Sequence, residues 1–307
     1  MASILRVDKG FDHSFFKGAS CAFGVFDGFH AGHQFMLACA QETAAKNGGK
    51  SIALTFDIDP DEIFYPQRLR KLMGNDDRIE ALASSGIEAV AVLPFTREFA
   101  ALSPADFLTS TFNGFAPYAL HVGSDFRFGA QAKGTVAELE AWGKAQGARI
   151  CAHGLKTATG SPITSTRIRH LLAATDVERA QALLGRPYFI RAQVQPGRGE
   201  GGAFGFATAN LKVEPLMQVL GEGVYAAYVD VCGVRYRAAV SVGVSPMFKD
   251  RTDATCEAHI LDYEGDLYGK EIKVSFMHFL RPMMSFASQE ELINTVMSNI
   301  AWVRENL

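Results

Sequence analysis

Two histidines in a glycine-rich segment near the amino terminus have a spacing that suits phosphate chemistry. The segment follows a predicted strand, opens a predicted helix, and contains Gly24, Phe26, Asp27, Gly28, His30, Gly32 and His33. Backbone N–H groups and the helix dipole at such a turn favour an anion. His30 and His33 project to one side of the helix, so they could donate hydrogen bonds to the phosphoryl oxygens of a triphosphate as pyrophosphate leaves. A metal-binding pair and two incidental surface histidines are the alternatives.

A hydroxyl and a guanidinium farther along the chain could bind the same phosphate. Thr166 and Arg169 lie three residues apart in a predicted helical pattern over 165–184, so they share one face. The forked guanidinium of an arginine matches the oxygens of a phosphate. The neighbouring Ser165 could instead, or in addition, cap the amino terminus of that helix.

Between these two segments, aromatic and charged side chains follow the end of another predicted strand. Asp125, Phe126, Arg127 and Phe128 stand between Gly123 and Gly129. Such a segment could hold a flat ring, although packing into the core is the ordinary role of phenylalanine.

The second half of the chain carries oxygen donors of another kind. Thr208 and Asn210 are two residues apart, so in an extended chain they point the same way and could supply neutral oxygens to a magnesium nucleotide. Glu257 stands in an alternating, strand-like run, where a carboxylate at a cleft could take the proton of an attacking hydroxyl. A solvent-facing glutamate is the alternative.

Short apolar runs alternate with helical patterns from residue 20 to about residue 152. The predicted strands cover 21–25, 51–56, 89–93, 119–122 and 148–152, and the predicted helices cover 34–47, 76–85, 104–111 and 136–146. This alternation predicts an α/β domain with a parallel sheet, helices on both faces and ligands at the carboxyl ends of the strands.

The pattern changes after residue 184. Strand-like runs over 188–195, 224–232, 234–242, 255–261 and 272–279 are separated by glycine-rich turns, and one helix is predicted over 289–304. These runs predict a small antiparallel β-barrel with a terminal helix. We therefore expect two domains, over 1–184 and 185–307.

Composition excludes several classes of protein. The 307 residues are 48% hydrophobic and 21% charged, with a formal net charge of −3, which is typical of a globular chain and unlike a dedicated nucleic-acid binder. Its apolar runs are far shorter than the roughly 20 residues that span a bilayer, so we expect no membrane partner. Five cysteines without a Cys-x-x-Cys pair favour free thiols. Because no secretory segment stands at the start, a cytoplasmic location is expected.

Three segments together resemble those of the bifunctional prokaryotic FAD synthetases: the glycine–histidine segment over 24–33, the aspartate–phenylalanine segment over 123–129 and the serine–threonine–arginine segment over 165–169. The resemblance covers nearly the whole chain. In that family a Rossmann-like nucleotidyltransferase domain, which adenylylates FMN, is joined to a riboflavin kinase. The resemblance implies magnesium, ATP as a co-substrate, and flavins as substrates and products. It implies ATP contacts for His30, His33, Ser165, Thr166 and Arg169, and flavin contacts for Asp125, Phe126 and Phe128.

In the kinase domain, the resemblance implies metal contacts for Thr208 and Asn210, catalysis by Glu257 and a flavin contact for Arg281. Polar or rigid residues of the family are replaced here by Gly202, Ala207, Ser241, Met247 and Met283. The main prediction is therefore phosphorylation of riboflavin followed by adenylylation of FMN. The alternatives are adenylylation alone, a non-catalytic flavin-binding protein, and a nucleotidyltransferase for a different acceptor.

Overall fold

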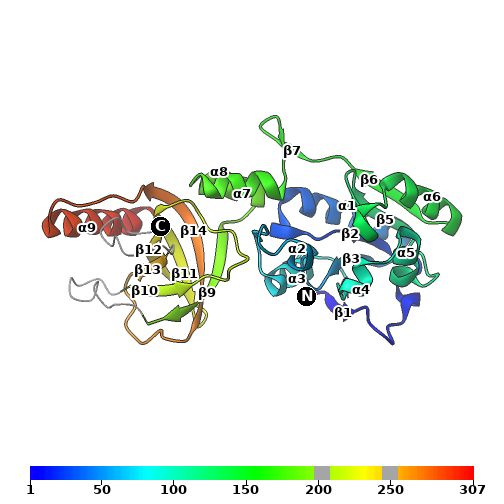
Figure 1. Cartoon of the computed structure of the whole chain (residues 1–307), viewed down its shortest axis with the longest axis horizontal. Helices are drawn as coiled ribbons and strands as arrows, with labels where there is room; N and C mark the ends of the chain where they lie inside the picture. Colours follow the sequence, from blue (N-terminus) through cyan, green and yellow to red (C-terminus); the bar gives the residue numbers. More distant parts are fainter. Residues whose placement is uncertain (197–207, 244–254) are drawn as a thin grey trace. The chain divides into compact units, whose positions relative to one another are not determined.

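The computed structural model describes residues 1–196, 208–243 and 255–307, which form two compact units (Figure 1). The first unit comprises residues 1–69 and 73–165, and the second comprises residues 70–72 and 166–307. Gly202, Ala207 and Met247, three of the positions that depart from the family pattern, lie outside the described residues.

The first unit is built on a six-stranded sheet in which every pair of neighbours runs parallel. In spatial order its strands are β1 (Ser3–Arg6), β4 (Ala89–Leu93), β3 (Ser51–Phe56), β2 (Ser20–Phe23), β5 (Ala119–Gly123) and β6 (Arg149–His153). The central strands are fully buried, as expected for a sheet covered on both faces. The predicted α/β architecture is therefore confirmed, and β1 is an additional edge strand.

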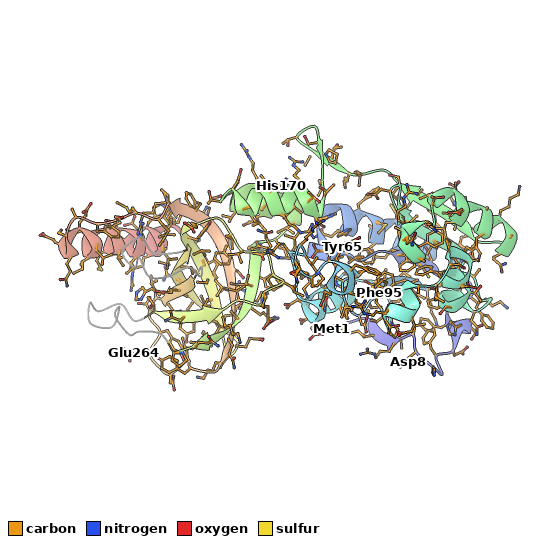
Figure 2. All side chains as sticks on the ribbon, in the orientation of Figure 1. Met1, Asp8, Tyr65, Phe95, His170 and Glu264 are labelled. Atoms are coloured by element: carbon orange, nitrogen blue, oxygen red, sulfur yellow. The ribbon has the colours of Figure 1, made fainter. Side chains whose placement is uncertain are left out.

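Helices cover both faces of this sheet. On one face, α5 (Pro104–Phe112) and α6 (Val136–Gln146) bring Phe107, Phe112 and Leu139 onto the core. On the other face lie α1 (Ala31–Asn47) and α3 (Asn75–Ala83). Side chains fill the space between these layers (Figure 2), and Phe95, labelled there, packs against Phe56 with ring centroids 5.0 Å apart.

Short elements complete the first unit. Single turns of helix connect the strands, and a two-stranded hairpin precedes residue 165: η1 (His13–Phe16), η2 (Asp27–Phe29), α2 (Asp61–Phe64), α4 (Arg97–Ala100), η3 (Ala130–Ala132), β7 (Thr157–Ala158) and β8 (Ser161–Pro162).

The second unit contains a closed antiparallel barrel of six strands, which confirms the second architectural prediction. In spatial order these are β10 (Ala209–Lys212), β13 (Thr255–Ile260), β12 (Val234–Gly243), β11 (Gly223–Val231), β14 (Glu271–Arg281) and β9 (Tyr188–Gln195). The terminal helix α9 (Gln289–Asn306) begins at the capping residue Ser288 and buries Ile300 and Val303 against Ala226 and Leu261.

The helical pattern predicted over 165–184 is divided into α7 (Ser165–Ala173) and α8 (Val177–Leu184). The chain breaks at Thr175, whose φ of 65° is left-handed. Helix α8 contacts β14, where a carboxylate oxygen of Glu178 lies 3.2 Å from Nδ1 of His278. The division between the compact units falls after Ser165, the first residue of α7. The domain boundary at 184/185 stays a prediction.

None of the helices in the described ranges is long and apolar enough to cross a bilayer. All five cysteines lie within those ranges, and each is a free thiol, as predicted.

Candidate functional site

The glycine-rich turn after β2 holds its backbone in a conformation that most residues avoid. Phe26, Gly28 and Phe29 have φ values of 61°, 74° and 44°. A non-glycine residue in this region costs on the order of 1–3 kcal/mol and persists only where the surroundings fix it. Here both phenylalanines are buried, with exposures of 1% and 9%. The turn is therefore a constrained feature at the carboxyl end of a central strand.

The two histidines of the turn stack on each other. The imidazoles of His30 and His33 have centroids 3.6 Å apart and planes 14° apart. The backbone N–H of His33 donates to Nδ1 of His30 over 3.3 Å, so His30 caps the amino terminus of α1. Because Nδ1 of His30 accepts this bond, its proton lies on Nε2.

Burial keeps both imidazoles uncharged at neutral pH. It lowers the pKa of His30 to about 4 and holds the pKa of His33 well below its usual range, where the neighbouring His30 lowers it further. Nδ1 of His33 is buried without a hydrogen-bond partner. An orphaned buried N–H is rarer than an orphaned acceptor, which places the proton of His33 on Nε2. The pair thus consists of two neutral N–H donors.

Ser165 lies beside this turn. Its hydroxyl donates to the backbone carbonyl of Asp27 over 3.0 Å, which ties the start of α7 to the glycine-rich turn. Ser165 is the first residue of the helix, and its side chain makes this long-range bond. Gly32 is also closely fitted, since a Cβ there would lie 3.1 Å from the ring of His30.

A cavity of about 260 Å³ opens at the carboxyl ends of β2, β5 and β6. This is where open α/β sheets bind ligands. Its walls combine predicted residues with residues that were not predicted. The predicted ones are Gly24, His30, Gly32, His33, Asp125, Phe126 and Ser165, and the others include Phe35, Met36, His153, Leu155 and Lys156. Sequence reasoning missed His153, Leu155 and Lys156 because only the pairing of β5 with β6 brings them to the cavity. Phe35 and Met36 lie on α1 shortly after His33, where apolar side chains give no sign of a ligand site.

Some residues of the aspartate–phenylalanine segment line the cavity, and others pack into the core. Asp125 and Phe126 line the cavity, and the ring of Phe126 packs 5.3 Å from that of Phe23. Phe128 is 4% exposed and belongs to the apolar core, with its ring 5.4 Å from that of Phe107. The flavin contacts of all three residues stay predictions.

A buried arginine holds the turn against β3 by hydrogen bonds. Arg78 is 1% exposed and donates to the backbone oxygens of Val25 and Phe56 and to the hydroxyl of Thr55, over 3.1, 2.9 and 2.7 Å. Burial lowers its pKa, while nearby carboxylates, Asp59 first, oppose that shift. A lone arginine in a helical pattern gives no sign of this role in the sequence.

The remaining predicted ATP residues belong to the second unit. Thr166 and Arg169 lie on α7, and Nε of Arg169 donates to the backbone carbonyl of Arg70 over 2.5 Å. Their contacts with ATP stay predictions.

In the barrel, the register of the strands places polar residues side by side. Asn210 of β10 pairs with Glu257 of β13, which pairs on its other side with Ser241 of β12. Paired residues share a face of the sheet. The residues that flank them are buried: Ala209, Leu211, Cys256, Ala258, Val240 and Val242. The three polar side chains therefore form a half-buried row on the outer face of the barrel.

Other predicted kinase residues lie near the ends of this row. Thr208 is exposed and directly precedes β10. Val224 pairs with Ser241 on one side and with Arg281 on the other, so Arg281 continues the row. Burial lowers the pKa of Arg281, whose Nε has no hydrogen-bond partner among the residues that the structure describes. Met283 follows two residues later and is half-buried.

Comparisons with known proteins agree with this architecture. A family model described as FAD synthetase matches residues 12–167, and one described as riboflavin kinase matches residues 184–307. A solved structure from Streptococcus pneumoniae, described as a macrolide-efflux protein, has a TM-score of 0.85 at 26% identity and covers 99% of both chains. That likeness concerns the fold.

Curated relatives match over most of the chain. A bifunctional riboflavin kinase/FMN adenylyltransferase from Pseudomonas fluorescens is 32% identical over 94% of this chain and 93% of its own. Proteins of the same description from Listeria monocytogenes and Escherichia coli are 31% and 32% identical, over 89% and 90% of this chain and 87% and 88% of theirs. The chain therefore belongs to the family of bifunctional riboflavin kinase/FMN adenylyltransferases.

Proposed function

We propose that this chain phosphorylates riboflavin to FMN on its barrel and adenylylates FMN to FAD at the cavity of its first unit, with ATP as the co-substrate of both steps. The observation that carries the proposal is the stacked pair His30 and His33, whose donors lie at the wall of that cavity. Matches to both domain families support it.

In the adenylylation step, a phosphate oxygen of FMN attacks the α-phosphorus of ATP. The bond from that phosphorus to the oxygen bridging to the β-phosphate breaks, and pyrophosphate leaves. Negative charge builds on the phosphoryl oxygens, where the Nε2–H groups of His30 and His33 stabilise it. Because both imidazoles are neutral, they act as hydrogen-bond donors and not as proton donors. Ser165, Thr166 and Arg169 bind the same nucleotide.

In the phosphorylation step, the terminal hydroxyl of riboflavin attacks the γ-phosphorus of ATP, and ADP leaves. Glu257 accepts the proton of that hydroxyl. Asn210 lies directly beside it in the register, so an amide and a carboxylate face the same side of the barrel. Arg281, farther along the row, contacts the flavin.

Magnesium fits the donor set of this row. Thr208 and Asn210 offer neutral oxygens, which are hard ligands of the kind the ion prefers, and they would hold it. When bound, the ion neutralises charge on the phosphates of ATP.

A specific observation favours the second candidate, adenylylation alone. Ser241 stands beside Glu257, where the resemblance implies an asparagine, and Met283 stands where it implies an acid. Serine is shorter than asparagine, and methionine lacks the carboxylate of an acid, so both changes reduce the hydrogen bonds that these positions can offer to a substrate. The pair Asn210 and Glu257 remains together, which supports a working kinase. The variant Ser241→Asn tests whether this position limits the kinase. Faster phosphorylation of riboflavin by the variant would attribute a weak kinase activity to Ser241.

We also propose that ATP and flavins are the partners of this chain and that it acts in the cytoplasm. The family assignment supports the substrates, and composition supports the exclusion of nucleic acid. The absence of a membrane-spanning helix from the described residues agrees with that location.

The experiment separates the two steps. Purified protein is given either riboflavin or FMN with magnesium ATP, and riboflavin, FMN and FAD are resolved by chromatography. Glu257→Gln is expected to abolish phosphorylation and leave adenylylation of supplied FMN unchanged. Glu264→Gln, the same change at an exposed position of the same unit, is expected to leave both steps intact. Equal phosphorylation by parent and Glu257→Gln would contradict the assigned base.

A further inference from the structure

A second pair of histidines lies on the neighbouring strands β5 and β6, and one of the two, His153, lines the cavity. His121 of β5 pairs in register with Cys151 of β6, which places His153 diagonally across from it on the same face of the sheet. Nδ1 of His121 lies 2.8 Å from Nε2 of His153, and the ring planes are 10° apart. The two imidazoles therefore share one hydrogen bond.

His121 fixes the direction of this bond. It is 2% exposed, and its Nε2 is buried without a partner. Burial lowers its pKa to about 4 and also lowers the pKa of His153, so both rings are neutral at pH 7. An orphaned acceptor costs less than an orphaned N–H. The proton of His121 accordingly lies on Nδ1 and is donated to Nε2 of His153.

This direction determines what His153 presents to the cavity. Since its Nε2 accepts, its own proton lies on Nδ1. Within the described part of the chain, Nδ1 of His153 makes no hydrogen bond, and it is not among the buried atoms that lack a partner, so it is accessible to solvent. His153 lines the cavity that His33 also lines. The cavity therefore has a further N–H donor, away from the stacked pair.

The surroundings of His153 suit a flat base. Its ring meets that of Phe35 edge to face at 5.8 Å, and Nζ of Lys156 lies 4.6 Å from the centre of the same Phe35 ring. Met36 and Leu155 add apolar surface to the lining. Ligand sites commonly combine apolar walls with a few fixed polar groups.

We propose that His153 donates its Nδ1–H to a ring nitrogen of the adenine of ATP, and that His121 is a positioning residue that holds His153 in the donating tautomer. The proposal rests on the proposed adenylylation at this cavity. It assigns base recognition to a pair of side chains that takes no part in the phosphate chemistry.

The central test is a cycle that changes protein and nucleotide together. His153→Phe keeps a flat ring without the donor, and losing one such bond is expected to raise KM for ATP about tenfold in FMN adenylylation, with kcat within about twofold. The 1-deaza, 3-deaza and 7-deaza analogues of ATP each lack one acceptor. One of them is expected to show the same penalty with the parent and none with His153→Phe. Equal penalties in both proteins for all three analogues would overturn the proposal.

A second set of variants tests the positioning role. His121→Asn can still donate toward His153, whereas His121→Leu cannot. The first is expected to keep KM near that of the parent, and the second to raise it. Nitrogen-15 chemical shifts of histidine-labelled protein report the tautomer directly: we expect the Nδ1–H form of His153 in the parent and a mixture in His121→Leu. An Nε2–H form in the parent would refute the assignment.

Separate controls test whether each variant folds and whether the parent protein adenylylates FMN. Phosphorylation of riboflavin and thermal unfolding are measured on each preparation. The double variant His121→Leu/His153→Phe replaces both partners by apolar groups, which removes the penalty of an unpaired buried donor. If the parent does not adenylylate FMN, the proposed function fails. If it does and KM is the same in the parent and in the folded double variant, only this inference fails.

Discussion

The backbone N–H of His33 donates to Nδ1 of His30, and the two imidazoles lie 3.6 Å apart at their centroids. The bond that begins α1 therefore also sets the tautomer of the first histidine. One local arrangement provides a helix cap and a pair of neutral donors at the cavity.

Removing either donor is expected to slow adenylylation. His30→Ala and His33→Ala should each lower kcat for FAD formation by about 10²-fold or more, the scale for one transition-state donor. Initial rates with FMN and magnesium ATP measure the effect. His170→Ala, at an exposed position of α7, is the control and should match the parent. Parent-like rates in both test variants would remove the phosphate role.

Arg169 is expected to bind the same nucleotide as the histidines. Lysine cannot reproduce the fork of the guanidinium, so Arg169→Lys should raise KM for ATP in adenylylation. Arg167→Lys on the same helix is the matched control. If Arg169→Lys behaves like the parent while Ser165→Ala unfolds the protein, the segment serves the helix and not the nucleotide.

Stability of the first unit is expected to fall as the pH drops below 6.5. Burial lowers the pKa of His30 and of His121 to about 4, so the unfolded chain takes up protons first. Each histidine should remove about 2 kcal/mol of unfolding free energy between pH 7.5 and 5, most of it below pH 6.5, and almost nothing above pH 7.5.

Urea unfolding of a Trp302→Phe variant, followed by the fluorescence of Trp142, measures this change in the first unit. Trp142 stacks on Phe112 with ring centroids 5.2 Å apart, and the chain has only two tryptophans. A midpoint that stays constant from pH 7 to pH 5 would show that the histidines are not held neutral.

Arg78 is expected to be needed for both stability and adenylylation. Arg78→Met leaves the oxygens of Val25, Thr55 and Phe56 without their donor, and breaking a buried charged network costs about 3–5 kcal/mol. Chemical unfolding and FAD formation are measured together. Arg97→Met, at an exposed position, is the control. A loss below 1 kcal/mol would mean that water replaces the guanidinium.

The architecture of both units could be predicted from the sequence, because the patterns of strands and helices are regular. Alternating strands and helices predict the parallel sheet, and closely spaced strands predict the barrel. Strand β1 was not predicted because it has only four residues, most of which are exposed. Strand β10 was not predicted either, being equally short. The break between α7 and α8 was missed because Thr175 adopts a left-handed φ without being a glycine.

The candidate site was predictable where neighbours in sequence are neighbours in space. His30 and His33 illustrate this, since a helix brings them together. His121 and His153 do not, because they meet only through the register of β5 and β6. Glu257 lies between these cases: its strand was predicted, while its place between Asn210 and Ser241 depends on three strands pairing correctly.

The central claim is that one chain carries riboflavin through to FAD. The most direct measurement is a time course of parent protein with riboflavin and magnesium ATP, in which riboflavin, FMN and FAD are resolved by chromatography. We expect FMN to appear first and FAD to follow, with ADP and pyrophosphate released in step. No FMN at saturating riboflavin, together with rapid FAD formation from supplied FMN, would contradict the bifunctional account and leave adenylylation alone.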